Sequence, residues 1–211
     1  MKKSIYIVVL YFLLILAGCG NANVDKTDTQ EDEADLIKEE EIKKAQRDAQ
    51  TLWGVLDEQG NEIEMLPDDH TDVQSIMTSV INHVKVTNNR DHKTINAEAE
   101  YPFYMDEFAE GLKNSDYGTA LQEMYEKNEL STEQVEIVWY KSYFNENIST
   151  CKVTIDCEFI FTGAKPEYLE EMGLKLDTVY MEQRVYYCQK IDKEWKITNI
   201  EKGALEEKGT M

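Results

Sequence analysis

The chain has 211 residues, of which 42% are hydrophobic and 30% are charged, as expected for a globular protein of one or two domains. Its 10 glycines and 3 prolines are too few for a collagen-like or mostly disordered chain. Asp and Glu outnumber Lys and Arg by 42 to 22, so the formal net charge is −20 at pH 7. A surface this acidic repels phosphate backbones and argues against nucleic-acid binding.

The first 18 residues have the order of a secretory signal peptide. Lys2 and Lys3 precede an apolar run from Ile5 to Leu16, and small residues follow that run. The run is shorter than the roughly 20 residues that span a bilayer as a helix. A cleaved signal peptide over residues 1–18 is therefore favoured over a retained signal anchor, which is the alternative.

The boundary sequence Leu16-Ala17-Gly18-Cys19 resembles the lipobox of bacterial lipoproteins. The resemblance implies cleavage between Gly18 and Cys19 and a diacylglyceryl group on the Cys19 thiol. Two acyl chains hold a protein durably on a membrane, whereas one chain binds only marginally. We therefore expect a lipid anchor on the extracytoplasmic face of the cell membrane. Loss of the two leader lysines would change the net charge from −20 to −22.

The residues after the anchor predict a tether followed by one folded domain. Residues 19–35 are acidic and contain Val24 as their single bulky apolar side chain, which is typical of a flexible linker. We expect the folded domain to cover residues 36–202, with residues 203–211 as a C-terminal tail. No later segment contains the run of about 18 apolar residues that a membrane-spanning helix needs.

The first half of the domain shows mainly helical periodicity. Apolar residues recur every three or four positions from Ile42 to Leu56, which predicts a helix that Gly60 ends. A second helix is expected from Asp72, as its N-cap, through Val80.

The period then changes to two. Val84 and Val86 lead into a predicted turn at residues 88–91, and the alternation over residues 95–101 predicts a strand of a hairpin. Residues 104–127 return to helical spacing, with a break at residues 117–118.

The remainder of the chain alternates like a series of antiparallel strands with one short helical insertion. We expect strands at about 135–144, 151–161, 180–191 and 195–200, a short helix within 166–177, and turns at 145–147 and 192–194. Consecutive strands with helices grouped beside them predict an α+β domain whose curved antiparallel sheet packs on helices.

This order of elements, ending in the hairpin sequence from Val185 to Ile197, is similar to the NTF2-like, cystatin-like fold. The resemblance covers roughly residues 36–202 and implies a cone of N-terminal helices packed on a curved sheet, but no particular site residue. Domains of this family are frequent on bacterial lipoproteins and also occur in conjugative secretion machinery.

Three cysteines remain besides Cys19. Cys151 and Cys157 lie six residues apart on one predicted strand, about 20 Å from each other, which is too far for a disulfide. Cys188 could bridge either of them only from an adjacent strand with matching face and register. The alternatives are buried thiols that act as small hydrophobic side chains, or a reactive thiol.

The three histidines, His70, His83 and His92, lie in or near predicted loops and lack the spacing of a metal site. We expect them to be solvated or to cap helices. No nucleophile elbow or phosphate-binding glycine loop occurs either.

Enzymes of the NTF2-like family place a carboxylate or a histidine inside the cone as a general base. Four acidic residues in the predicted strands fall on the polar side, opposite the aliphatic residues, so we expect them to face water. Two residues near the C-terminus are ambiguous. The four acids are Glu98, Glu100, Asp156 and Glu158, and the ambiguous pair is Glu182 and Arg184.

Aromatic side chains gather on the predicted sheet, and several strands look apolar on both sides. One face of the sheet must pack on the helices, while the other could line a cavity, form a homodimer or dock a partner. Tyr and Trp suit such partly hydrated interfaces. The candidate binding face consists of Trp139, Tyr140, Tyr143, Tyr186 and Trp195.

Together these patterns predict a membrane-anchored lipoprotein that acts by binding, without catalysis, cofactor or metal. Its expected partners are the membrane, through the lipid on Cys19, and an envelope protein or a small apolar ligand; a homodimer is a further option. One alternative is an accessory component of an envelope assembly such as conjugative secretion machinery. The other is a small cavity enzyme of the NTF2-like type.

Overall fold

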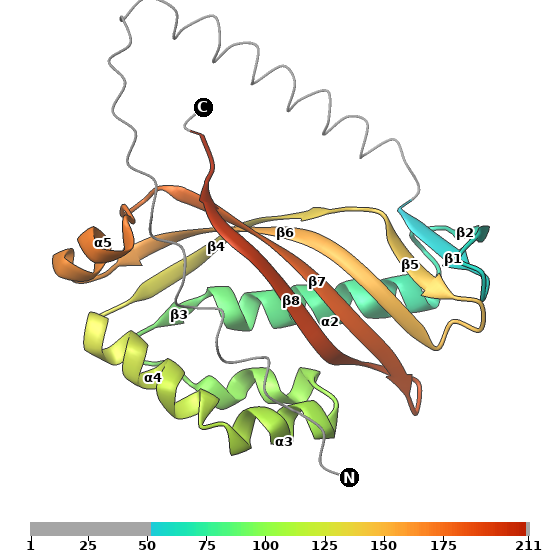
Figure 1. The fold of residues 1–211 in the computed structure, drawn as a ribbon, viewed down its shortest axis with the longest axis horizontal. Coiled ribbons are helices and arrows are strands. Elements are labelled where there is room, and N and C mark those ends of the chain that lie inside the picture. The colour runs from blue at the N-terminus through green and yellow to red at the C-terminus, as the bar shows by residue number, and fades with distance from the viewer. Residues whose placement is uncertain (1–51, 210–211) are drawn as a thin grey trace, which may run out of the picture.

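The strand β6 (Thr150–Gly163) forms the centre of a curved, mostly antiparallel sheet in the computed structural model, which describes residues 52–209 (Figure 1). One edge of β6 pairs with β4 (Ser131–Trp139) and β5 (Ser142–Asn145). The other edge pairs with β7 (Val179–Ile191), which pairs in turn with β8 (Glu194–Glu207). The predicted signal peptide, Cys19, the tether and residues 36–51 lie outside the described residues.

Two shorter segments extend the sheet beyond β5 and β4. The hairpin of β1 (Trp53–Leu56) and β2 (Glu62–Leu66) joins it through a parallel pairing of β1 with β5. The two-residue strand β3 (Arg90–Asp91) pairs with β4. The prediction that a helix continues to Leu56 is therefore wrong for its last residues.

Gly54 lies in strand β1, where its lack of a side chain lets the neighbouring strands pack closely against it. A Cβ atom on Gly54 would lie 2.7 Å from Glu62 Oε2 and 3.0 Å from Tyr143 Cδ1, so the neighbouring strands approach this residue closely. Trp53 and Val55, on either side of it, are buried in the core. The apolar residues of this segment are spaced as in a helix, but the same residues are buried when the segment forms a strand.

Helix α2 (Thr71–Asn88) lies along the concave side of the sheet (Figure 1). Its N-cap is His70, whose Nδ1 accepts a hydrogen bond from the Asp72 N–H, so the expectation of Asp72 as the cap is wrong. The helix also continues to Asn88, through the residues predicted to enter a hairpin. Its buried residues follow the helical period to the last turn, but two of the last ones, His83 and Asn88, are polar. The apolar pattern of the sequence therefore does not show where the helix ends.

The segment predicted as a strand over residues 95–101 is instead part of the 3₁₀ helix η1 (Ala97–Phe103). The Asn96 side chain accepts a hydrogen bond from the Glu98 N–H and thereby begins the helical turn. Two α-helices follow, α3 (Asp106–Asn114) and α4 (Tyr117–Asn128). The helical region is therefore broken as predicted, but at residues 115–116 instead of 117–118.

Most of the C-terminal half agrees with the prediction, but the single strand predicted at about 135–144 is wrong, because the chain forms β4 and β5 there with residues 140–141 between them. Strand β6, the short helix α5 (Pro166–Met172), β7 and β8 occur in the expected order. The β7–β8 turn has Asp192 and Lys193 both at positive φ, 48° and 75°, the conformation of a tight two-residue hairpin. Strand β8 runs to Glu207 and so includes residues 203–207, which the prediction assigns to the tail.

The main core lies between α2 and the concave side of the sheet, and its members are almost completely buried. Each such aliphatic side chain contributes about 1.5–3 kcal/mol when it leaves water. The contacts are made by Val73, Ile76, Val80 and Val84 of α2 against Val153, Ile155 and Ile197 of the sheet. Within residues 52–209 no helix has the length and hydropathy needed to cross a bilayer.

Candidate functional site

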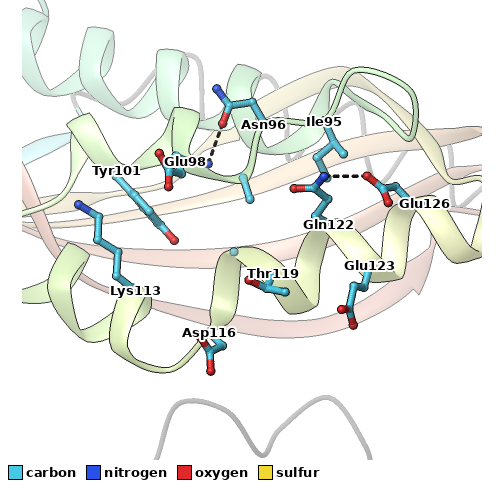
Figure 2. A pocket seen from close by; sticks show the side chains of 12 residues that line it. Ile95, Asn96, Glu98, Tyr101, Lys113, Asp116, Thr119, Gln122, Glu123 and Glu126 are labelled. Carbon is cyan, nitrogen blue, oxygen red and sulfur yellow. Dashed lines mark hydrogen bonds between the residues drawn. The ribbon is translucent and has the colours of Figure 1, made fainter.

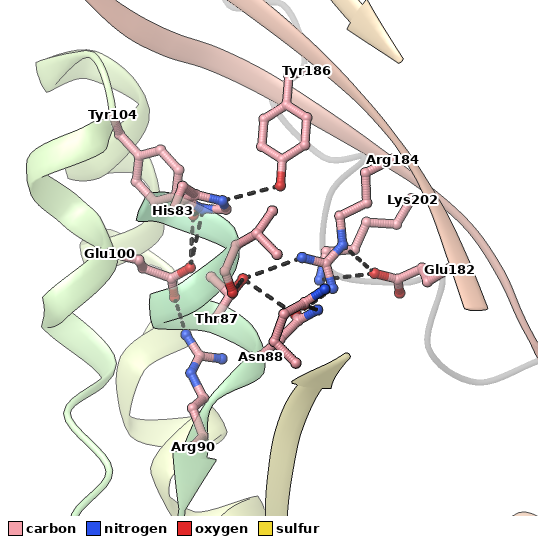
Figure 3. Close-up of polar contacts among 12 residues, drawn as sticks. His83, Thr87, Asn88, Arg90, Glu100, Tyr104, Glu182, Arg184, Tyr186 and Lys202 are labelled. Atoms are coloured by element: carbon pink, nitrogen blue, oxygen red, sulfur yellow. Dashed lines mark hydrogen bonds and ion pairs between the residues drawn. The ribbon is translucent and has the colours of Figure 1, made fainter. Parts of the chain in front are cut away.

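A chain of hydrogen bonds runs through the interior of the domain, between α2, η1 and the concave side of the sheet (Figure 3). His83 of α2 lies at its centre, with Nδ1 3.1 Å from the Tyr186 hydroxyl and Nε2 2.8 Å from the Tyr104 hydroxyl. Tyr104 donates to Glu100 Oε2 over 2.7 Å. Arg90 of β3 donates to the other carboxylate oxygen over 3.0 Å. We call these five residues the His83 cluster.

The donor and acceptor of each hydrogen bond in the His83 cluster follow from the Glu100 carboxylate, which can only accept. Because Tyr104 gives its proton to Glu100, its oxygen accepts from His83, and Nε2 therefore carries the proton of a neutral imidazole. The lone pair of Nδ1 then accepts from the Tyr186 hydroxyl. Both ring nitrogens and both carboxylate oxygens thus have protein partners.

Burial and the neighbouring charges decide how the cluster ionises. Burial is the main reason that the pKa of His83 falls to about 4, although the Glu100 carboxylate opposes this change. Burial alone would raise the pKa of Glu100, but His83, the Arg90 guanidinium and the Tyr104 hydroxyl outweigh it and lower the pKa to about 2. At neutral pH the cluster therefore holds a neutral imidazole and one carboxylate–guanidinium pair.

A second polar group lies beside the His83 cluster on β7 (Figure 3). Arg184 Nε donates to Glu182 Oε2 over 2.5 Å, and its terminal nitrogens donate to Thr87 Oγ1 and Asn88 Oδ1 over 3.2 and 2.7 Å. Lys202 Nζ lies 3.8 Å from the same Glu182 oxygen. Burial alone would raise the pKa of Glu182, but Lys202 and Arg184 outweigh it and lower the pKa below its usual value.

The structure corrects several expectations about these ionisable residues. His83 and Glu100 are buried between the helices and the sheet rather than solvated, and the ambiguous pair Glu182 and Arg184 faces the concave side. Of the buried side-chain nitrogen and oxygen atoms in residues 52–209, only Arg90 Nε has no hydrogen-bond partner. The interior therefore has the residue types of a general acid–base site, but its groups are committed to one another.

Asp156 and Glu158 correct the prediction in a different way. They lie on the convex side of the sheet, as expected, but neighbouring side chains bury them. The Tyr140 hydroxyl donates to Asp156 Oδ2 over 2.5 Å, and Lys208 Nζ donates to Glu158 Oε1 over 2.7 Å. Glu98, by contrast, is exposed as predicted.

A groove of about 590 Å³ opens between η1, the end of α3 and α4 (Figure 2). Its lining is mainly polar, with one aromatic ring, Tyr101, over which Lys113 Nζ lies at 5.2 Å from the ring centre. Such a lining does not suit the small apolar ligand that the sequence suggested. The ionisable residues of the groove are Glu98, Tyr101, Lys113, Asp116, Glu123 and Glu126.

The predicted aromatic face is divided between the two sides of the sheet. Tyr186 and Trp195 are buried in the core on the concave side, where the Trp195 indole donates to Asp72 Oδ1 over 3.0 Å. Trp139 packs against Trp53, with ring centres 5.9 Å apart, at the edge of the same core. The prediction that these three residues form a binding face is therefore wrong.

Tyr140 and Tyr143 lie on the convex side, and there a third tyrosine joins them. The strand register places Tyr143, Lys152 and Tyr187 opposite one another across β5, β6 and β7. Lys152 Nζ lies 5.8 Å from the centre of the Tyr187 ring, and Lys152 itself is exposed. We call Tyr140, Tyr143, Lys152 and Tyr187 the outer tyrosine patch.

Tyr187 is absent from the predicted binding face, because the alternation along this strand is ambiguous in the sequence. In fact the register shows that Glu182, Arg184, Tyr186 and Cys188 share the concave side. The partners that make polar residues acceptable there come from α2, about a hundred positions away in the chain.

The remaining cysteines and histidines of the described residues take the following positions. Cys151, Cys157 and Cys188 are all buried, and no disulfide joins them in this structure. His70 caps α2, as a predicted capping role allows, and His92 is half-buried beside β4. Among residues 52–209 no three His, Cys, Asp or Glu side chains are grouped as metal ligands.

No protein-family model matches this sequence, and no curated protein matches it significantly. The intermembrane space region of the chloroplast protein ARC6 is a similar solved structure, with 13% identity and a TM-score of 0.41 over 63% of this chain and 97% of that one. An IcmL-like type IV secretion system protein from Legionella pneumophila shows 9% identity and a TM-score of 0.44 over 69% and 98%. Bd1075 from Bdellovibrio bacteriovorus shows 12% identity and a TM-score of 0.39 over 68% and 44%.

Proposed function

We propose that this protein is a lipid-anchored extracytoplasmic lipoprotein whose NTF2-like domain binds an envelope protein through the outer tyrosine patch. The observation that carries the proposal is the asymmetry of the sheet. Helices α2, α3 and α4 lie on its concave side, whereas the row of Tyr143, Lys152 and Tyr187 lies on the convex side with Lys152 exposed (Figure 1).

The chemistry of this row suits a protein partner. Tyrosine offers a large, stiff ring with a polar tip, so it contributes contact area at a small cost in side-chain entropy. Lys141 Nζ lies 5.8 Å from the centre of the Tyr143 ring but is paired with Glu62 Oε2 at 2.6 Å, so Lys152 is the cation that this surface offers to a partner. A partner with aliphatic and acidic side chains would complement this surface.

The anchor would hold the domain close to the membrane without pressing it against the lipid. A flexible tether over residues 19–35 has a root-mean-square reach of about 20–25 Å. The mature chain, with its charge of −22, is repelled by an anionic leaflet, so the lipid on Cys19 would supply the attachment. The outer tyrosine patch would then be available to a neighbouring envelope protein.

In-cell crosslinking of the anchored protein, followed by mass spectrometry, tests the proposal. We expect one recurrent partner whose recovery falls at least about tenfold in the double variant Tyr143→Ala/Tyr187→Ala, which corresponds to roughly 1.4 kcal/mol. The matched control is Thr162→Ala, an exposed position on β6 outside the patch. Unchanged recovery in the double variant would rule out the patch, and absence of any partner above background would rule out the binding role.

Anchoring is tested separately. The variant Cys19→Ala lacks the thiol that the lipid needs, so we expect the wild type, but not this variant, to incorporate labelled fatty acid. Absence of label in the wild type, or equal labelling of the variant, would contradict the lipoprotein proposal but leave the binding surface unaffected.

A further inference from the structure

Two of the three buried cysteines face each other across the sheet. The register of β6 and β7 places Cys151 directly opposite Cys188, and both side chains lie on the concave side in the core. Cys157, six residues further along β6, lies opposite Glu182 instead. The structure therefore distinguishes between the two partners that the sequence left open for Cys188.

The Cα atoms of this pair lie at a separation that a disulfide can bridge, whereas its Cβ atoms must approach each other. Lys190 N–H donates to the Ser149 carbonyl over 2.9 Å, and Cys151 and Cys188 lie two residues further along the same antiparallel register. Hydrogen-bonded pairs recur every second residue, so these cysteines form such a pair, whose Cα atoms are about 5.5 Å apart. Disulfides join cysteines with Cα separations of roughly 4.4–6.8 Å and Cβ separations of roughly 3.5–4.5 Å. The Cβ atoms of a hydrogen-bonded pair lie roughly 5.5 Å apart, so the two strands must shift by about 1 Å before the bond can close.

The thiols are also protected once the strands have paired. Burial raises the pKa of Cys188 to about 12, and burial together with the nearby Cys188 raises the pKa of Cys151. Because the thiolate is the reactive form, oxidation of the folded sheet should be slow. The pair lies near the β7–β8 turn, so oxidation during folding, or after opening of this end, should be faster.

We propose that Cys151 and Cys188 form a disulfide that links β6 to β7 when the folding chain meets a disulfide-bearing oxidant. In the cell this inference rests on the proposed extracytoplasmic location, because such oxidants act outside the cytoplasm.

The exchange balances in two steps. One cysteine thiolate attacks the disulfide of the oxidant, forms a mixed disulfide and releases one thiolate. The other cysteine then attacks the mixed disulfide, closes the Cys151–Cys188 bond and releases the second thiolate. The two cysteines lose two electrons and two protons, and the oxidant disulfide is reduced to two thiols.

The first experiment maps the bond in the protein purified from detergent-extracted membranes. Free thiols are blocked with N-ethylmaleimide during lysis, and the non-reduced protein is digested and analysed by mass spectrometry. We expect a peptide pair joined through Cys151 and Cys188, with the Cys157 thiol alkylated. A bond through Cys157 would overturn the proposal.

The second experiment separates the chemistry of the pair from the location of the protein. The same protein is unfolded, reduced and refolded in buffers of oxidised and reduced glutathione. We expect the Cys151–Cys188 bond to form and to raise the Tm by roughly 5–12 °C over the reduced protein.

The cysteine variants complete this test. Cys151→Ala and Cys188→Ala should lose the difference in Tm between the oxidised and reduced forms, and Cys157→Ala is the matched control that should keep it. Refolding without the bond would refute the pair. A bond that forms on refolding, while the protein from cells has free thiols, would support the pair and contradict the extracytoplasmic location.

Discussion

Acidification should destabilise this protein because folding keeps His83 neutral. The pKa of His83 is about 4 in the folded protein, against 6.5 for an exposed histidine. Above pH 6.5 the imidazole is neutral in both states, and its contribution to stability is complete. As the pH falls from 6.5 to 4, the unfolded chain binds a proton that the folded chain does not, and stability is lost. The difference of about 2.5 in pKa corresponds to roughly 3 kcal/mol.

Urea denaturation at a series of pH values from 7.5 to 4 measures this loss. In the variant His83→Gln an amide replaces the imidazole and offers one donor and one acceptor, but does not titrate. We expect the free energy of unfolding of this variant to vary less over that range, by roughly 3 kcal/mol. His92→Gln, outside the cluster, should retain the acid-dependent loss. Parallel curves for wild type and His83→Gln would refute the reasoning.

Three further substitutions test other contacts by the same denaturation at pH 7. Glu100→Gln leaves the Arg90 guanidinium buried without its carboxylate and should cost about 3–5 kcal/mol; a cost below about 1 kcal/mol would contradict the ion pair. Trp195→Phe keeps a ring in the core but loses the hydrogen bond to Asp72, which should cost about 1 kcal/mol, and no loss would argue against that bond. Gly111→Ala places a methyl group in open space within α3 and should stabilise the protein by about 0.5–1 kcal/mol; destabilisation would contradict the exposed helix.

The parts of the fold that the sequence predicts well are those whose pattern is local. Strand β6 alternates buried and exposed residues along its first half, and the Asp192–Lys193 turn separates β7 from β8. Both signals depend on neighbouring positions alone, so they can be identified without knowledge of the rest of the chain.

The errors occur where distant residues decide the structure. The apolar stripe of α2 ends in His83 and Asn88, and these polar residues are acceptable in the core only because Tyr104, Tyr186 and Arg184 bind them. A pattern of hydrophobicity cannot represent such pairing, so the end of this helix resembles a turn in the sequence.

Glu100 is also mispredicted for a non-local reason, here as an exposed residue that is in fact buried. In the sequence it alternates with small apolar residues and suggests the exposed face of a strand, whereas η1 turns it towards the core. Its burial depends on the ion pair with Arg90, which the short strand β3 places beside it. The register between β6 and β7, which identifies the cysteine pair, is likewise a property of the folded sheet.

The polar interior is consistent with a proposed recognition surface on the convex side. Arg184 binds Thr87 and Asn88 in the last turn of α2, where a cation is favoured by the helix dipole, so this contact fixes the end of the helix on β7. Arg90 and Glu100 similarly join β3 to η1. Contacts that hold the concave side together leave few groups there to meet a partner, and the outer tyrosine patch lies on the opposite side of the same strands.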